Sequence, residues 1–324
     1  MMRTLTFSEA LREALHEEME RDDTIFVIGE DVITHGGPYK VTDGISERFP
    51  GRIFETPIAE AGIMGVGVGA AMAGMNPVVE IMYMDFVTCA MDEVVNQAAK
   101  MRYMTGGQAS VPMVIRLPCG VGRLLAAQHS QIMESWFMHV PGLQVVVPST
   151  PGDAKGLLKS AIRSSDPVLF FEYKRIYTST GGVPDGDHII PLGQAKICRE
   201  GEDATVVAIG PMVQKSLEAA VLLEDDGYDV EVVDARSLSP LDTETICESV
   251  SRTGRAVVCG EDSSFAGAAS EIAAMIGENC FRDLNGPVVR VGSPHVPMPF
   301  SSELVKHVVP EVPDITEAVS RVMV

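Results

Sequence analysis

Residues 56–74 read Thr-Pro-Ile-Ala-Glu-Ala-Gly-Ile-Met-Gly-Val-Gly-Val-Gly-Ala-Ala-Met-Ala-Gly, and Glu60 is the only charged residue among them. A run of apolar residues and glycines packs closely against another part of the protein, which makes Glu60 a candidate buried carboxylate with a special partner. An acid in the first turn of a helix is also favoured by the helix dipole. The stretch by itself therefore leaves two interpretations open, a functional acid and a helix-terminus acid.

The glycines of this run resemble part of a nucleotide-binding motif, because Gly65, Gly67 and Gly69 alternate with apolar residues. The tail of the dinucleotide fingerprint is missing, and we expect the glycines inside a helix rather than in the turn before it. The chain also lacks a Walker A sequence, H-E-x-x-H and G-x-S-x-G. Close packing of a helix explains the glycines better than a phosphate site does.

Apolar segments on both sides of the run alternate between strand and helix patterns. Thr6 and Glu9 have the spacing of a capping box, which predicts a helix over 7–21. The glycine-rich run and residues 87–104 and 153–163 are further expected helices, and strands are expected at 24–29, 52–55, 78–82, 113–116, 145–147 and 168–171. Continuous apolar strands separated by helices indicate a parallel sheet covered on both faces.

A change of composition divides the chain into two expected domains. Residues 178–203 are rich in glycine and charge and are expected to be a linker between a domain at 1–177 and a domain at 204–324. In the second domain we expect strands at 205–209, 230–233, 256–259 and 288–291, with helices at 213–223, 243–251 and 266–276. The fold class is therefore α/β, with two doubly wound domains.

Composition limits the possible functions. The chain has 324 residues, with 25 basic and 45 acidic side chains and a formal net charge of −20, which argues against nucleic acid as a partner. The apolar run from Ala61 to Met75 is too short to cross a membrane, and no leader precedes Thr6. The six cysteines are scattered without a C-x-x-C pair, so we expect reduced thiols and a cytoplasmic location.

Seven short motifs, taken together, resemble one protein family. The chain is similar over its whole length to the beta subunit of the thiamine-diphosphate-dependent first component of 2-oxo acid dehydrogenase complexes. That family includes the pyruvate, branched-chain 2-oxo acid and acetoin dehydrogenases. The resemblance rests on Gly29-Glu30-Asp31-Val32, residues 56–62, Asn96-Gln97-Ala98-Ala99-Lys100, Ala127-Gln128-His129-Ser130-Gln131, His139-Val140-Pro141-Gly142-Leu143, residues 153–158 and Val296-Pro297-Met298-Pro299.

The resemblance implies a transketolase-like fold, with a pyrimidine-binding domain followed by a transketolase C-terminal-like domain. Enzymes of this kind bind the diphosphate through a magnesium motif that begins Gly-Asp-Gly and ends in Asn-Asn, and this chain has neither sequence. The resemblance therefore implies an alpha subunit that holds Mg²⁺ and shares the cofactor in an alpha2beta2 assembly. We expect the glycine-rich helix to be buried at subunit contacts.

In the family's arrangement, Glu60 hydrogen-bonds the pyrimidine ring nitrogen and so helps the cofactor to lose its C2 proton. Phe86 matches the aromatic residue that lies against this ring, and its alternative is a core phenylalanine. Ile58 and Met82 match positions that line the same pocket, or else they are ordinary core residues. His129 matches a histidine at the substrate channel, where an imidazole serves proton transfer or carboxylate binding.

Many beta subunits also bind K⁺ through backbone carbonyls. The matching residues are Met113, Ala161, Ile162, Ser164 and Asp166. At the last two positions some relatives have Asp and Asn instead, and carbonyl ligands tolerate such changes. Another departure is the bulky Arg123-Leu124-Leu125 before His129, where relatives have smaller residues.

The implied reaction is C–C cleavage next to a carbonyl, such as decarboxylation of a 2-oxo acid, followed by transfer of the acyl unit to a lipoyl group. A lipoyl acyltransferase core would then be the second partner. Two alternatives remain open from the sequence. One is the C-terminal half of a split transketolase-like enzyme, and the other is a non-catalytic interaction subunit that keeps only the interfaces.

Overall fold

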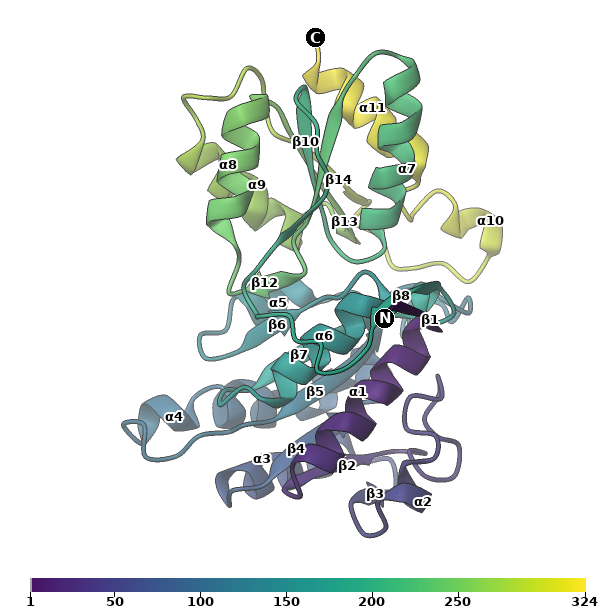
Figure 1. The fold of residues 1–324 in the computed structure, drawn as a ribbon, viewed down its shortest axis with the longest axis vertical. Helices are drawn as coiled ribbons and strands as arrows, with labels where there is room; N and C mark the ends of the chain where they lie inside the picture. Colours follow the sequence, from purple (N-terminus) through teal and green to yellow (C-terminus); the bar gives the residue numbers. More distant parts are fainter. Residues whose placement is uncertain (1) are drawn as a thin grey trace. The chain divides into compact units, whose positions relative to one another are not determined.

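The computed structural model describes residues 2–324, and the chain divides into two compact units (Figure 1). The N-terminal unit comprises Met1–Cys119 and Trp136–Leu192. The C-terminal unit comprises Gly120–Ser135 and Gly193–Val324. The boundary between Leu192 and Gly193 lies inside the expected linker. Residues 120–135 belong to the C-terminal unit although they follow a strand of the N-terminal one.

The N-terminal unit contains the parallel sheet expected from its apolar strands. Its strands run in the order β6-β7-β5-β4-β2-β3, and each neighbouring pair is parallel. Their bounds are β2 Ile25–Gly29, β3 Ile53–Glu55, β4 Asn76–Glu80, β5 Val114–Cys119, β6 Gln144–Val146 and β7 Val168–Tyr173. All residues of β2, β5 and β7 are buried, which fits a sheet covered on both faces.

Helices cover the two faces of this sheet. On one face, helix α1 (Phe7–Arg21) packs on α6 (Pro151–Ile162) over a core that includes Val78 of β4. On the other, helix α3 (Glu60–Met72) lies against the next residue of β4, Val79. Successive side chains of a strand point to opposite faces, so α3 covers the face opposite to α1 and α6. The predicted capping box of α1 is present in both directions.

The helix expected over 87–104 is wrong as a single element. The chain instead forms the 3₁₀ helix η1 (Met84–Ala90), the π-helical turn η2 (Glu93–Ala98) and the short helix α4 (Met101–Met104). Thr88 donates its hydroxyl to the Asp85 carbonyl, 2.8 Å away, a local bond that competes with regular α-helix. β-Branched residues in this segment also lower its helix propensity.

The segment expected to be a linker contains two strands. β8 (Thr180–Pro184) pairs antiparallel with β1 (Met2–Thr6), and β9 (Lys196–Arg199) pairs antiparallel with β11 (Val230–Asp234). Backbone hydrogen bonds to β1 and β11, rather than apolar side chains, hold these two strands in place. Their sequences therefore show little apolar pattern. The sequence pattern therefore did not show them.

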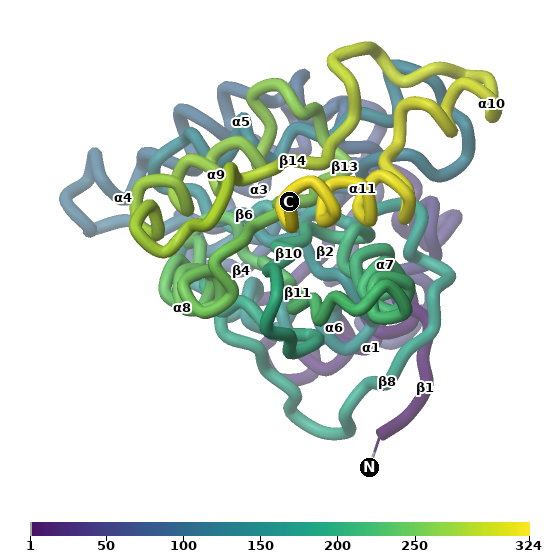
Figure 2. The backbone as a smooth tube through the Cα atoms, turned by 90° about the horizontal axis from the view of Figure 1, so that it is seen from above, coloured from purple at the N-terminus to yellow at the C-terminus, as the bar shows by residue number. Residues whose placement is uncertain are grey.

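The C-terminal unit has a second sheet, ordered β14-β13-β10-β11-β9 and parallel except for β9. Its strands are β10 Ala204–Ala208, β11 Val230–Asp234, β13 Ala256–Ser263 and β14 Val289–Ser293. Helices α7 (Met212–Asp225) and α11 (Val312–Val322) cover one face, and α8 (Thr243–Thr253) and α9 (Ala268–Asn279) the other (Figure 2). Two doubly wound α/β folds are thus confirmed.

Several smaller elements and one long helix were not expected. Helix α11 is amphipathic and begins with a capping box formed by Glu311 and Asp314, so a signal for it is present in the sequence. The short elements are α2 Ile45–Arg48, α5 Glu134–Met138, η3 Lys174–Ile176, β12 Ser237–Ser239 and α10 Ser302–Val305. Among residues 2–324 no helix is long and apolar enough to cross a membrane.

Candidate functional site

Glu60 is the first residue of helix α3 and is half-buried. The buried face of this helix packs closely on the sheet because of a glycine. A Cβ on Gly67 would lie 2.7 Å from Val79 Cγ2 and 3.0 Å from Met113 Cε, closer than side chains tolerate. Gly67 therefore sets the distance between α3 and the sheet, and with it the position of Glu60.

The opposite face of α3 is apolar and exposed. Gly65 and Gly69 have open space around them among the described residues, while Val66 is 54% and Met72 43% exposed. Glycine within a helix is unfavourable by about 1 kcal/mol relative to alanine, and no packing among residues 2–324 requires these two glycines. An uncovered apolar face of this kind is typical of a contact with another molecule.

Two carboxylates meet at the carboxyl end of the sheet. Glu30 follows β2 directly, and its pKa is raised above its usual range, first by burial and then by the charges of Asp31 and Glu60. Because β2 and β3 are parallel neighbours, the chain leaving β3 enters α3 beside the end of β2. Glu60 therefore shares its surroundings with Glu30 at the edge where ligands bind in open parallel sheets.

The remaining predicted pocket residues lie at the same end of neighbouring strands. Met82 and Phe86 follow β4, and both are half-buried, with the Phe86 ring 6.3 Å from the Tyr83 ring. Helix α3, which begins at Glu60, contacts η1, which carries Phe86. Ile58, just before α3, is 71% exposed. The structure thus brings the elements that carry all four residues to one edge of the sheet.

A buried ionic cluster lies beside this edge, and sequence reasoning missed it. Arg116 of β5 donates two hydrogen bonds of 2.7 Å to Glu172 of β7 and a third to Glu80 of β4. Tyr177 donates its hydroxyl to Glu172. Glu80 Oε1 is buried without a hydrogen-bond partner among residues 2–324, and burial raises the pKa of Glu80. The sequence signal that could have revealed this cluster is a single charged residue in each of the apolar strands β4, β5 and β7.

The candidate K⁺ ligands cluster around the start of β5 and the end of α6. Three of their carbonyls already accept hydrogen bonds: Met113 from Val168 N at 2.9 Å, Ala161 from Ser164 N at 3.2 Å and Ile162 from Asn76 Nδ2 at 2.7 Å. Each carbonyl has a second lone pair for a cation. Asn76 Oδ1 is buried and unpartnered among the described residues, which adds a neutral oxygen. The Asp166 carboxylate pairs with Arg102, 2.6 Å away.

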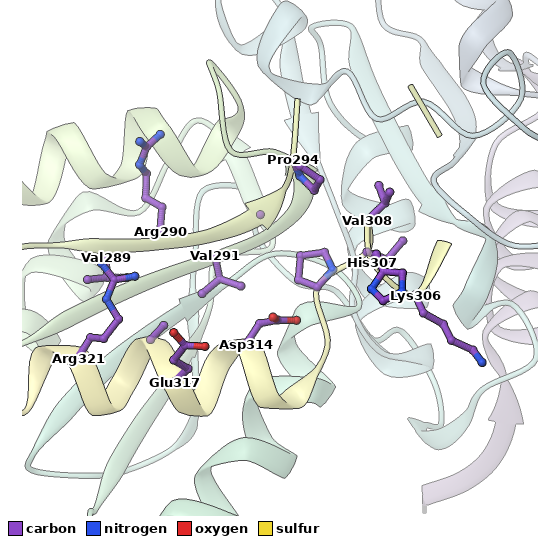
Figure 3. A pocket seen from close by; sticks show the side chains of 14 residues that line it. Val289, Arg290, Val291, Pro294, Lys306, His307, Val308, Asp314, Glu317 and Arg321 are labelled. Atoms are coloured by element: carbon purple, nitrogen blue, oxygen red, sulfur yellow. The ribbon is translucent and has the colours of Figure 1, made fainter. Parts of the chain in front are cut away.

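His129 lies in the C-terminal unit, within the segment 120–135, and is half-buried. The structure therefore places it in a different unit from the other predicted residues. A cavity of about 390 Å³ in the C-terminal unit, between β14 and α11, contains none of the predicted residues (Figure 3). Its lining includes Arg290 and Arg321 beside Asp314 and Glu317. Basic and acidic side chains are mixed there, as on an ordinary solvated surface.

Comparison with known proteins adds independent findings. Residues 3–180 match the family model "Transketolase, pyrimidine binding domain", and residues 193–315 match "Transketolase, C-terminal domain". The chain is 45% identical to the 2-oxoisovalerate dehydrogenase subunit beta of Bacillus subtilis, over 99% of this chain and 98% of the relative.

Other relatives carry related names. The chain is 46% identical to the pyruvate dehydrogenase E1 component subunit beta of Rickettsia felis, over 98% of each protein. It is 43% identical to the acetoin:2,6-dichlorophenolindophenol oxidoreductase subunit beta of Cupriavidus necator, over 100% of this chain and 98% of the relative. A solved structure titled "Split gene transketolase, inactive beta4 tetramer" has a TM-score of 0.79 at 27% identity, covering 98% of each chain.

Proposed function

Because this chain belongs to the transketolase-like beta subunits of 2-oxo acid and acetoin dehydrogenases, we propose that it supplies the pyrimidine-binding half of their thiamine diphosphate site. The observation that supports this most directly is the position of Glu60. It heads a helix at the carboxyl ends of β2, β3 and β4, and that helix contacts the turn that carries Phe86.

The proposed reaction is cleavage of a C–C bond next to a carbonyl, followed by transfer of the acyl unit to a lipoyl group. Bound thiamine diphosphate supplies the carbon nucleophile and the electron sink for this chemistry. The names of the relatives include pyruvate, a branched-chain 2-oxo acid and acetoin, so we infer one of these carbonyl compounds as substrate.

In this proposal Glu60 holds a proton at its carboxyl oxygen, in contact with the pyrimidine ring nitrogen. The neighbouring Glu30 has a pKa raised by burial and by the charges of Asp31 and Glu60, so this edge of the sheet disfavours a second solvated charge at Glu30. Phe86, Ile58 and Met82 present apolar surface that holds the ring in place. His129 binds the substrate carboxylate or transfers a proton.

The other half of the site would come from an alpha subunit that binds Mg²⁺ and the diphosphate. Two features support this assignment: the chain lacks Gly-Asp-Gly and Asn-Asn, and α3 has an uncovered apolar face. We place the chain in an alpha2beta2 assembly that serves a lipoyl acyltransferase core.

K⁺ bound by Met113, Ala161, Ile162, Ser164 and Asp166 would stabilise the N-terminal unit. The six cysteines are free thiols, which suits the cytoplasm.

The test is to reconstitute the chain with its alpha subunit and screen pyruvate, branched-chain 2-oxo acids and acetoin, with reduction of a lipoyl domain as the readout. We expect turnover of one class and acylation of the lipoyl group. Ketol transfer between sugar phosphates without lipoyl reduction would instead identify the half of a split transketolase, the kind of protein to which the chain is 27% identical in the structural comparison. No turnover of any of these substrates would favour a non-catalytic subunit.

A further inference from the structure

The segment that carries His129 is a closed loop held by the C-terminal unit. Residues 120–135 belong to that unit, and Gly120 N donates to the Gln131 carbonyl, 3.1 Å away, which closes the loop at its base. Near its start, Val121 is buried against Val305 and Val309. Compact loops whose ends meet in this way are often functional.

A carboxylate in the sheet of the C-terminal unit holds the start of this loop. Val121 N donates a hydrogen bond of 3.3 Å to Glu261 Oε1. Glu261 is 1% exposed and lies in β13, where its carbonyl accepts a 2.7 Å bond from Ser293 Oγ of β14. The side chain that accepts the Val121 N–H therefore stands on a fixed part of the sheet, and an N–H buried beside it has this oxygen as its acceptor.

The middle of the loop has a strained backbone. Leu124 and Ala126 have φ of +54° and +58°, a left-handed conformation that persists in such residues only when the surroundings enforce it. A cavity of about 250 Å³ lies between this part of the loop and the sheet, lined by Ala127, Ser130 and Gln131 on one side and by Glu261 and Asp262 of β13 on the other.

We propose that Glu261 is a positioning residue for His129. By accepting the Val121 N–H it holds the loop in its strained form and so determines where the imidazole stands during turnover. The effect on turnover rests on the function proposed above, whereas the attachment of the loop by Glu261 does not. The residue acts through the loop and needs no contact with the substrate.

The experiment compares Glu261→Ala with Glu261→Gln in the reconstituted complex. Hydrogen–deuterium exchange of the amides of 121–131 is measured together with kcat, KM and the pH profile. Alanine leaves the Val121 N–H buried without its acceptor, so we expect these amides to exchange about tenfold faster and kcat/KM to fall by a similar factor. His129→Ala is expected to remove one limb of the pH profile, and Glu261→Ala should make that same limb less pronounced. Glutamine keeps an acceptor oxygen and should rescue both the exchange rate and kcat/KM.

Asp242→Ala is the matched control, because Asp242 accepts backbone N–H groups of Thr245 and Ala195 elsewhere in the same unit. It should leave exchange in 121–131 at the wild-type rate. If Glu261→Ala fails to assemble, Val305→Ala takes its place, because Val305 packs against Val121 at the start of the loop. This variant is expected to speed amide exchange in 121–131.

Unchanged exchange in both Glu261→Ala and Val305→Ala would overturn the attachment. Faster exchange with an unchanged kcat/KM and pH profile would overturn the positioning role. If His129→Ala itself turned over at the wild-type rate, the function proposed for His129 would fail, while the exchange data would still report whether Glu261 holds the loop.

Discussion

At the scale of single residues, Glu60 carries the sharpest prediction. Glu60→Gln keeps the size of the side chain but removes its exchangeable acid proton, so we expect kcat to fall about 10²–10⁴-fold. Cofactor affinity and folding should change little. The measurement is C2-proton exchange of bound thiamine diphosphate, followed by NMR in the reconstituted complex. Glu47→Gln, an exposed acid of the same unit, is the control. Exchange at the wild-type rate in Glu60→Gln would leave Glu60 as a helix-terminus acid.

Asp262 makes stability depend on pH. Its Oδ2 accepts the Ala268 N–H at 2.6 Å, and burial raises its pKa from 3.8 to about 6. Between these values the folded protein binds more protons than the unfolded one, so stability falls as pH rises from about 4 to 6 and then levels off. Asp262→Asn should therefore stabilise the protein at pH 7.5 by up to about 3 kcal/mol and hardly at all at pH 4. Urea unfolding at both pH values tests this, and equal gains would contradict it.

The buried ionic cluster predicts an asymmetry between its members. Arg116→Met leaves Glu80 and Glu172 buried without their cation and should cost about 3–5 kcal/mol. Glu80→Gln removes a carboxylate whose charged form burial already disfavours, so it should cost less than about 1 kcal/mol or stabilise. Chemical unfolding of both variants is the measurement, and equal losses would show that the excess negative charge is compensated in some other way.

At the scale of elements, the two faces of α3 should respond differently to substitution. Gly67→Ala brings a Cβ against Val79 and should destabilise the isolated chain, whereas Gly65→Ala fills open space and should stabilise it by up to about 1 kcal/mol. Gly65→Leu should leave the isolated chain folded but block assembly with the alpha subunit. Thermal unfolding and light scattering of the mixed subunits measure these effects. Normal assembly of Gly65→Leu would show that this face of α3 does not lie in the interface with the alpha subunit.

The elements that the sequence predicted well have local signals. Helix α1 has its capping box and one apolar face, β2 is a short, continuous apolar run, and β7 begins with the apolar residues Val168–Phe171. The elements missed or misjudged depend on partners far along the chain. Strand β8 exists through its pairing with β1, and the broken turns of η1 and η2 replace a helix that periodicity alone favoured.

At the scale of the whole molecule, the proposal requires two different subunits for one cofactor. The chain alone should bind thiamine diphosphate weakly or not at all, because it lacks the ligands for Mg²⁺ and the diphosphate. Addition of the alpha subunit should produce tight, magnesium-dependent binding. Calorimetry of the isolated chain and of the mixture tests this. Micromolar, magnesium-dependent binding to the isolated chain would contradict the shared site.

Hydrophobic period and short motifs are local properties, so the alternation of strands and helices, the two doubly wound folds and the candidate site residues follow from the amino-acid sequence. It also singled out Glu60 and Phe86 through their motifs. The packing of Gly67 on the sheet, the open space around Gly65 and the ion pairs of Arg116 with Glu80 and Glu172 are visible only in the folded protein. The tertiary structure also assigned the His129 loop to the C-terminal unit. These facts depend on which distant residues pack together, and spacing along a single chain does not contain that information.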